Sequence, residues 1–163
     1  MLTKPLSPLY RSLFGGSDVL DLLTIFPLLV FLFYVVSKID GVTVIGILLY
    51  ILLVVNALLI ALAFHIFVLG LGIITTEVDN AIWIFREITA LGKVPVSVYR
   101  EPVSWILTFI LPVAAMITFP AQALMGILSW QGVVISFLFS SILLHLSLRT
   151  WHFALKQYAS ASS

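Results

Sequence analysis

Three polar side chains are notable because they lie deep inside long apolar stretches of the sequence. Asn56 and His65 fall between Asp40 and Glu77, where 36 residues carry no formal charge, and His145 lies in a second such stretch. An ionisable residue at membrane depth is a functional candidate. With only two scattered histidines and no acidic partner, we favour neutral imidazoles hydrogen-bonded to neighbouring helices over a proton relay or a metal site. Asn56 is interpreted as a contact between helices, with a substrate contact as the alternative.

Two prolines interrupt the second stretch. Pro112 and Pro120 lie eight residues apart, with Gln122 just beyond them. Each proline removes a backbone hydrogen bond, and in lipid the freed carbonyl group needs another partner. We therefore expect a kink or a partly re-entrant end, with simple bending for packing as the alternative. Together with Asn56 and His65, these prolines are the residues predicted to form a kink or line a pathway.

No recognisable catalytic apparatus is present. The sequence contains no phosphate-binding loop of the G-x-x-x-x-G-K type, no H-E-x-x-H motif and no G-x-S-x-G motif. It also contains no cysteine, which excludes disulfides, Cys-ligated metals and a thiol nucleophile. We predict no catalytic residues, no cofactor and no metal site. Without clustered acidic or histidine residues, an enzyme acting on lipid is disfavoured, and ATP that drives this protein would be hydrolysed by another chain.

The composition is that of an integral membrane protein. Of the 163 residues, 62% are hydrophobic and only 9% are charged, whereas soluble domains carry about 25% charged residues. The net charge of +1 and the lack of a basic stripe predict no nucleic-acid partner. We therefore expect the lipid bilayer to surround an all-α, polytopic bundle of transmembrane helices.

Four membrane spans are predicted, at about residues 19–37, 43–68, 103–128 and 133–148. The charge-free stretch that contains the second span is too long for one crossing of about 20 residues and too short for two crossings with a turn. Tilt, or a break at Gly70-Leu71-Gly72, would use the excess. A polar break at residues 129–132 separates the last two spans.

A short amphipathic helix is predicted at about residues 77–91. Thr76 can cap it, apolar residues recur at helical spacing, and Gly92 and Pro95 supply stop signals. Since Trp83 suits the headgroup layer, we expect this helix to lie in the plane of the membrane surface. The segments outside the spans, residues 1–18 and 149–163, are predicted to be a cytoplasmic loop and a cytoplasmic tail.

The distribution of basic residues predicts orientation. With four spans, only Lys38 lies on one side. The other seven of the eight basic residues lie on the opposite side: Lys4, Arg11, Arg86, Lys93, Arg100, Arg149 and Lys156. Because cytoplasmic loops are enriched in lysine and arginine, both termini are expected in the cytoplasm.

Three segments resemble permease subunits of exporter-type ABC transporters. Residues 4–9 (K-P-L-S-P-L) resemble a loop that precedes a span in these permeases. Residues 92–99 (G-K-V-P-V-S-V-Y) are similar to their R-Y-P-I-S-I-Y segment. Residues 107–112 (L-T-F-I-L-P), followed by F-P-A at 119–121, resemble their L-T-F-V-I-P … F-P-A span. The matches occur in the same order as in the family and extend from about Lys4 to Arg149.

The resemblance implies a multi-pass permease component of an ATP-driven exporter in the cell (inner) membrane. Its implied partners are a separate ABC ATPase subunit and a second permease, identical or different, with a path along the dimer interface. Family members usually have six spans, and this chain resembles the last four. The segment implied to contact the ATPase contains Lys4, Pro5, Leu6, Leu9, Tyr10 and Arg11. The alternative function is a stand-alone secondary transporter or channel, or a structural membrane subunit.

Overall fold

A computed structural model describes residues 9, 10, 19–75, 83, 87, 90–109 and 112–161. All its regular elements are helices, and this described part contains no strand, which confirms the all-helical prediction. The contacts divide the chain into two units, residues 1–41 and 42–163. Most of the amphipathic helix predicted at 77–91 lies outside the described residues.

The first unit contains helix α2, Val19–Lys38. Its 20 residues give a length of about 30 Å, which equals the hydrocarbon thickness of a bilayer. At its last turn the Lys38 ammonium lies 5.7 Å from the centre of the Tyr34 ring. The Ser37 hydroxyl donates a hydrogen bond of 2.7 Å to the Tyr34 carbonyl oxygen. By length α2 suits the first predicted span, although its place in a bilayer stays a prediction.

Two long helices dominate the second unit: α3, Val44–Thr75, and α7, Trp130–Ala161. Both are long and apolar enough to cross a membrane. Their starts are set by capping side chains. The Gly46 N–H donates to the Thr43 hydroxyl (3.0 Å) and the Gly132 N–H donates to the Ser129 hydroxyl (3.2 Å). Helix α3 continues unbroken through Gly70-Leu71-Gly72, so the break considered from the sequence is absent.

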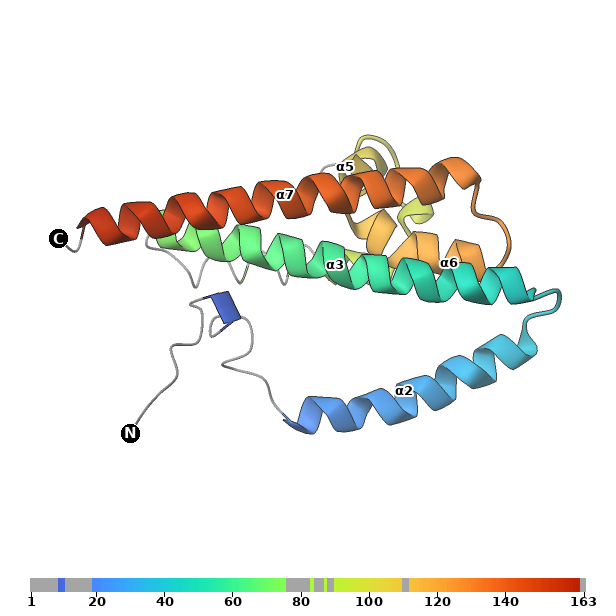
Figure 1. The fold of residues 1–163 in the computed structure, drawn as a ribbon. Coiled ribbons are helices and arrows are strands. Elements are labelled where there is room, and N and C mark those ends of the chain that lie inside the picture. The colour runs from blue at the N-terminus through green and yellow to red at the C-terminus, as the bar shows by residue number, and fades with distance from the viewer. Residues whose placement is uncertain are drawn as a thin grey trace. The chain divides into compact units, whose positions relative to one another are not determined.

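Helices α3 and α7 lie side by side and run in the same direction (Figure 1). Asn56 is hydrogen-bonded to Ser136, and a Cβ added at Gly70 would lie 3.2 Å from Thr150. Both contacts join residues 80 positions apart, which gives a parallel pair with one constant register. The buried residues of the two helices recur mostly at three- and four-residue intervals; those of α7 are Gly132, Val133, Ser136, Ser140, Ser147, Trp151 and Ala154.

Shorter helices precede α7 in place of one straight span. They are η1 (Leu91–Lys93), η2 (Val96–Val98), α5 (Val103–Phe109), the π-helix η3 (Ala114–Thr118) and α6 (Phe119–Leu124). The end of α6 lies against the start of α3, since a Cβ added at Gly46 would be 3.3 Å from the Ala123 carbonyl oxygen. The chain then turns at Gly126, whose φ of +71° favours glycine.

The segment from η2 to α6 folds back on itself. Val96, Leu107, Val113 and Ala114 form a buried cluster, against which Tyr99 and Phe119 pack. The Val96 N–H also donates to the Thr118 hydroxyl at 3.4 Å. The Val96–Thr118 hydrogen bond joins residues 22 positions apart, so the chain between them turns back as a hairpin. We call residues 91–127 the hairpin segment.

The outer surfaces of α3 and α7 are apolar. Leucine, isoleucine and valine side chains are exposed along both helices, for example Leu58, Leu62, Leu138 and Ile142. Apolar surface on this scale would be a liability in water, but it suits contact with lipid chains. The fold therefore presents a tight helix pair with a hydrocarbon-compatible exterior.

Candidate functional site

The most buried polar contact of the described residues joins α3 and α7. Asn56 is 1% exposed and Ser136 is fully buried. The Asn56 Nδ2 group donates to the Ser136 hydroxyl oxygen at 2.8 Å and to the Ser136 carbonyl oxygen at 3.2 Å. The Asn56 Oδ1 atom has no hydrogen-bond partner within the part of the chain that is described. This arrangement fixes the register of two helices and offers no group that could perform chemistry.

Small residues surround this contact and let the helices approach closely. Ser140 and Ser147 are buried on α7, and each hydroxyl donates to a carbonyl oxygen of its own helix at 2.9 Å. Their hydrogen bonds are thus satisfied without a ligand. Close packing of small side chains is a common way to join helices in lipid, where no hydrophobic force drives association. The interpretation of Asn56 as a contact between helices accounts for this geometry.

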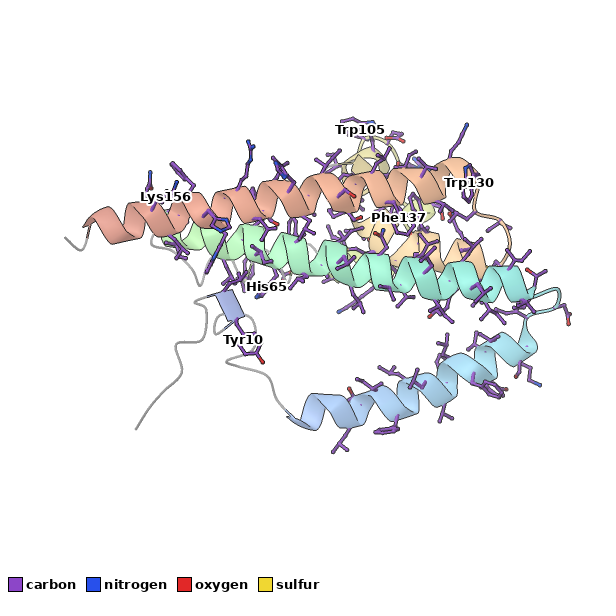
Figure 2. All side chains as sticks on the ribbon, viewed as in Figure 1. Tyr10, His65, Trp105, Trp130, Phe137 and Lys156 are labelled. Carbon is purple, nitrogen blue, oxygen red and sulfur yellow. The ribbon has the colours of Figure 1, made fainter. Side chains whose placement is uncertain are left out.

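The two histidines are not brought together at the helix interface. His65 is half-buried on α3, and His145 is exposed on α7. Each follows its helix's contact residue, Asn56 or Ser136, by nine positions. Nine residues at 100° each correspond to half a turn, so both histidines point away from the partner helix (Figure 2 for His65). The described residues also contain no group of three metal-ligating side chains.

Both prolines of interest lie in the hairpin segment. Pro112 is buried just before the π-helix, and its carbonyl oxygen accepts the Met116 N–H at 3.0 Å. Pro120 is buried in the first turn of α6, a position that tolerates the missing N–H group. Residues 110 and 111 are outside the described part. A role of Pro112 and Pro120 in a kink or pathway stays a prediction.

Of the predicted ATPase-contact residues, only Leu9 and Tyr10 fall in the described part of the chain. Both have helical backbone; Leu9 is half-buried and the Tyr10 side chain is 51% exposed. Lys4, Pro5, Leu6 and Arg11 lie outside the described residues. The contact with a partner remains a prediction for all six residues.

Two cavities lie near the start of α7. One, of about 380 Å³, lies between α3 and α7 and is lined almost entirely by apolar side chains such as Leu49, Leu52 and Phe137. The other, of about 330 Å³, lies in the hairpin segment and includes Lys93 and Gln122. We call this second cavity the Lys93 pocket. Sequence reasoning missed it, although Gln122 in an apolar stretch was the available signal.

The Lys93 pocket bears on the predicted distribution of charge. Lys93 and Ile127 line the same pocket, and Ile127 lies three residues before the start of α7. Figure 2 shows Trp130 and Lys156 near opposite ends of α7. The sequence-based count placed Lys93 on the same side as Arg149 and Lys156. That assignment of Lys93 to one side of the membrane stays a prediction.

Comparison with known proteins assigns the family. A family model described as ABC-2 family transporter protein matches residues 1–162. No curated protein and no solved structure matches the chain. The family match covers nearly the whole sequence and agrees with the three segments that resemble ABC permeases. This chain therefore belongs to the ABC-2 family of membrane transporter proteins.

Proposed function

We propose that the chain is the permease component of an ATP-driven ABC exporter whose ATPase is a separate subunit. The observation that carries this proposal is the family match over residues 1–162. The sequence itself has no phosphate-binding loop, so hydrolysis must occur on a partner. A second permease subunit, identical or different, would complete the translocation path.

The parallel arrangement of α3 and α7 supports an even number of crossings. Two parallel helices of one chain require the connection between Thr75 and Trp130 to return to the end where α3 began. With α2 as a further crossing before them, this supports the proposal of four passages with both termini on one side of the membrane. Arg149 and Lys156, near the end of α7, favour the cytoplasm for that side.

The proposed coupling contact can be tested at the N-terminal segment. Residues 4–11 combine apolar anchors with flanking charges, a pattern suited to a groove on a partner. A photo-crosslinking residue at Leu9 or Tyr10 should capture an ATPase subunit in native membranes. Replacing Leu6 and Leu9 by Asp should abolish transport while the protein stays in the membrane, as measured by cargo efflux and membrane fractionation.

A matched control and a contrary result complete the test. Leu13→Asp introduces one aspartate just outside residues 4–11 and should leave transport intact, whereas Leu6→Asp or Leu9→Asp alone should reduce it. If the segment only anchors the chain to anionic lipid through Lys4 and Arg11, no ATPase will be captured. Full transport activity in cells from which no ATPase co-purifies would instead support a stand-alone transporter.

A further inference from the structure

The Lys93 pocket combines a cation with uncharged polar groups. Lys93, Ser97 and Gln122 line it, and their side chains form no hydrogen bond or ion pair with any described residue. The hydroxyl oxygen of Thr118, which also lines the pocket, accepts the Val96 N–H. One ammonium, one hydroxyl and one amide thus line a common space, with Lys93 and Ser97 exposed and Gln122 half-buried. Such a set suits an anionic oxygen ligand, and lysine binds phosphate as a point charge.

The other wall of the same pocket is apolar and open. Ile117, Met125 and Ile127 line it, with exposed fractions of 42%, 50% and 65%. A volume of about 330 Å³ is at the small end of ligand sites, which range over about 300–1,000 Å³. The pocket can therefore enclose a headgroup, while an attached hydrocarbon chain would continue along the exposed apolar side chains.

One end of the pocket is close to the start of α7, where the sequence indicates a membrane surface. Residues 130–148 of α7 carry no formal charge, and Trp130 and Arg149 bracket about 28 Å of helix. This matches the hydrocarbon thickness of about 30 Å, with a tryptophan at one boundary and an arginine at the other. Ile127 precedes Trp130 by only three residues, so the Ile127 end of the pocket is close to the boundary marked by Trp130, where lipid headgroups are.

We infer that the Lys93 pocket binds the anionic headgroup of an amphiphile, with a phosphate on Lys93, Ser97 and Gln122 and its hydrocarbon chain along Ile117, Met125 and Ile127. The ligand reaches the pocket from the leaflet opposite the end that carries Arg149 and Lys156. The inference requires only that this chain is embedded in a bilayer, so it does not depend on the proposed export function.

The test uses the full chain in nanodiscs of phosphatidylcholine with 20% of a photoactivatable phosphatidylglycerol, a mole fraction chosen on the order of natural anionic lipid contents. Peptide mapping by mass spectrometry should find cross-links concentrated on residues 117–127. Lys93→Gln should reduce this cross-linking about fivefold, the effect of about one lysine charge near an anionic surface. Lys93→Arg keeps the charge and should retain most of the cross-linking.

The controls separate the pocket from general charge effects. Lys38→Gln removes another exposed lysine and should leave cross-linking to residues 117–127 unchanged. Unchanged cross-linking in Lys93→Gln, or equal cross-linking by photoactivatable phosphatidylcholine, would overturn the proposal. Soluble glycerol phosphate tests whether the pocket binds a free phosphate or a lipid headgroup. If it competes with the photoactivatable lipid as strongly as phosphatidylglycerol does, the proposed contact of the hydrocarbon chain with Ile117, Met125 and Ile127 is overturned.

Discussion

At the scale of single residues, Asn56 shows how little energy is needed to fix a helix register in lipid. Its Nδ2 group reaches both the hydroxyl and the carbonyl oxygen of Ser136. Side-chain hydrogen bonds between membrane helices contribute about 0.6 kcal/mol on average. The main effect of this hydrogen bond is on specificity, because a shift of α7 by one residue would leave the buried Asn56 amide without either acceptor.

We predict that Ser136→Ala lowers the free energy of unfolding by less than about 1 kcal/mol, because the Asn56 amide keeps the carbonyl acceptor. Asn56→Ala should cost more, since it also leaves a cavity beside the buried interface. A double-mutant cycle in bicelles should give a coupling energy of about 0.6 kcal/mol.

Ser141→Ala is the matched control for this cycle. Ser141 is exposed and donates to the Phe137 carbonyl oxygen of its own helix, so its coupling to Asn56 should be zero within error. A coupling energy for Ser136 no larger than that for Ser141 would contradict the assigned contact.

At the scale of elements, the sequence predicts where helices form better than it predicts which helices pack together. Thr43 and Ser129 cap α3 and α7, and the polar break at 129–132 marks the start of α7. The prolines led to the expectation of a kink or a re-entrant end before α7, and the described residues there form several short helices. The π-helix and the hairpin contact of Val96 with Thr118 were not predictable, because they depend on packing between residues 22 positions apart. The pairing of Asn56 with Ser136 escaped prediction for the same reason.

The parallel register predicts which introduced cysteines can pair, and the natural sequence contains none to interfere. Gly70→Cys with Thr150→Cys should form a disulfide on mild oxidation, because their backbones are in close contact. Gly70→Cys with Ser141→Cys, another small hydroxyl residue of α7 nine positions earlier, should not. Gel mobility with and without reductant reports disulfide formation in both double-cysteine variants. Pairing in the second variant alone would mean a different register.

At the scale of the whole molecule, the two ends of the α3–α7 pair differ in chemistry. One end carries Trp130 and the hairpin segment, and the other carries the exposed basic residues Arg149 and Lys156. Counting charges along the sequence assigned Lys93 to the same side as the basic tail, and this assignment stays a prediction. The chain between Val96 and Phe119 folds back on itself, which local sequence alone could not reveal.

Reporter fusions can test this arrangement in cells. A reporter after Lys156 should be active in the cytoplasm, and a reporter after Asp40 should be active outside. The physical reason is that the parallel helices α3 and α7 have Val44 and Trp130 at one end of the pair and Thr75 and Ala161 at the other (Figure 1). Alkaline phosphatase and a fluorescent protein serve as paired reporters for the two sides. A Lys156 fusion active only outside would contradict the cytoplasmic placement of the tail.

The 80-residue offset between α3 and α7 also has a consequence for how the protein is made. Chains are synthesised at about 5–20 residues per second, so Ser136 emerges about 4–16 s after Asn56. During that interval α3 has entered the bilayer with a polar amide and a stripe of small residues that have no partner. Assembly of the pair must therefore follow insertion of its first member, and a chain arrested before residue 136 would display an unmatched polar face to the lipid.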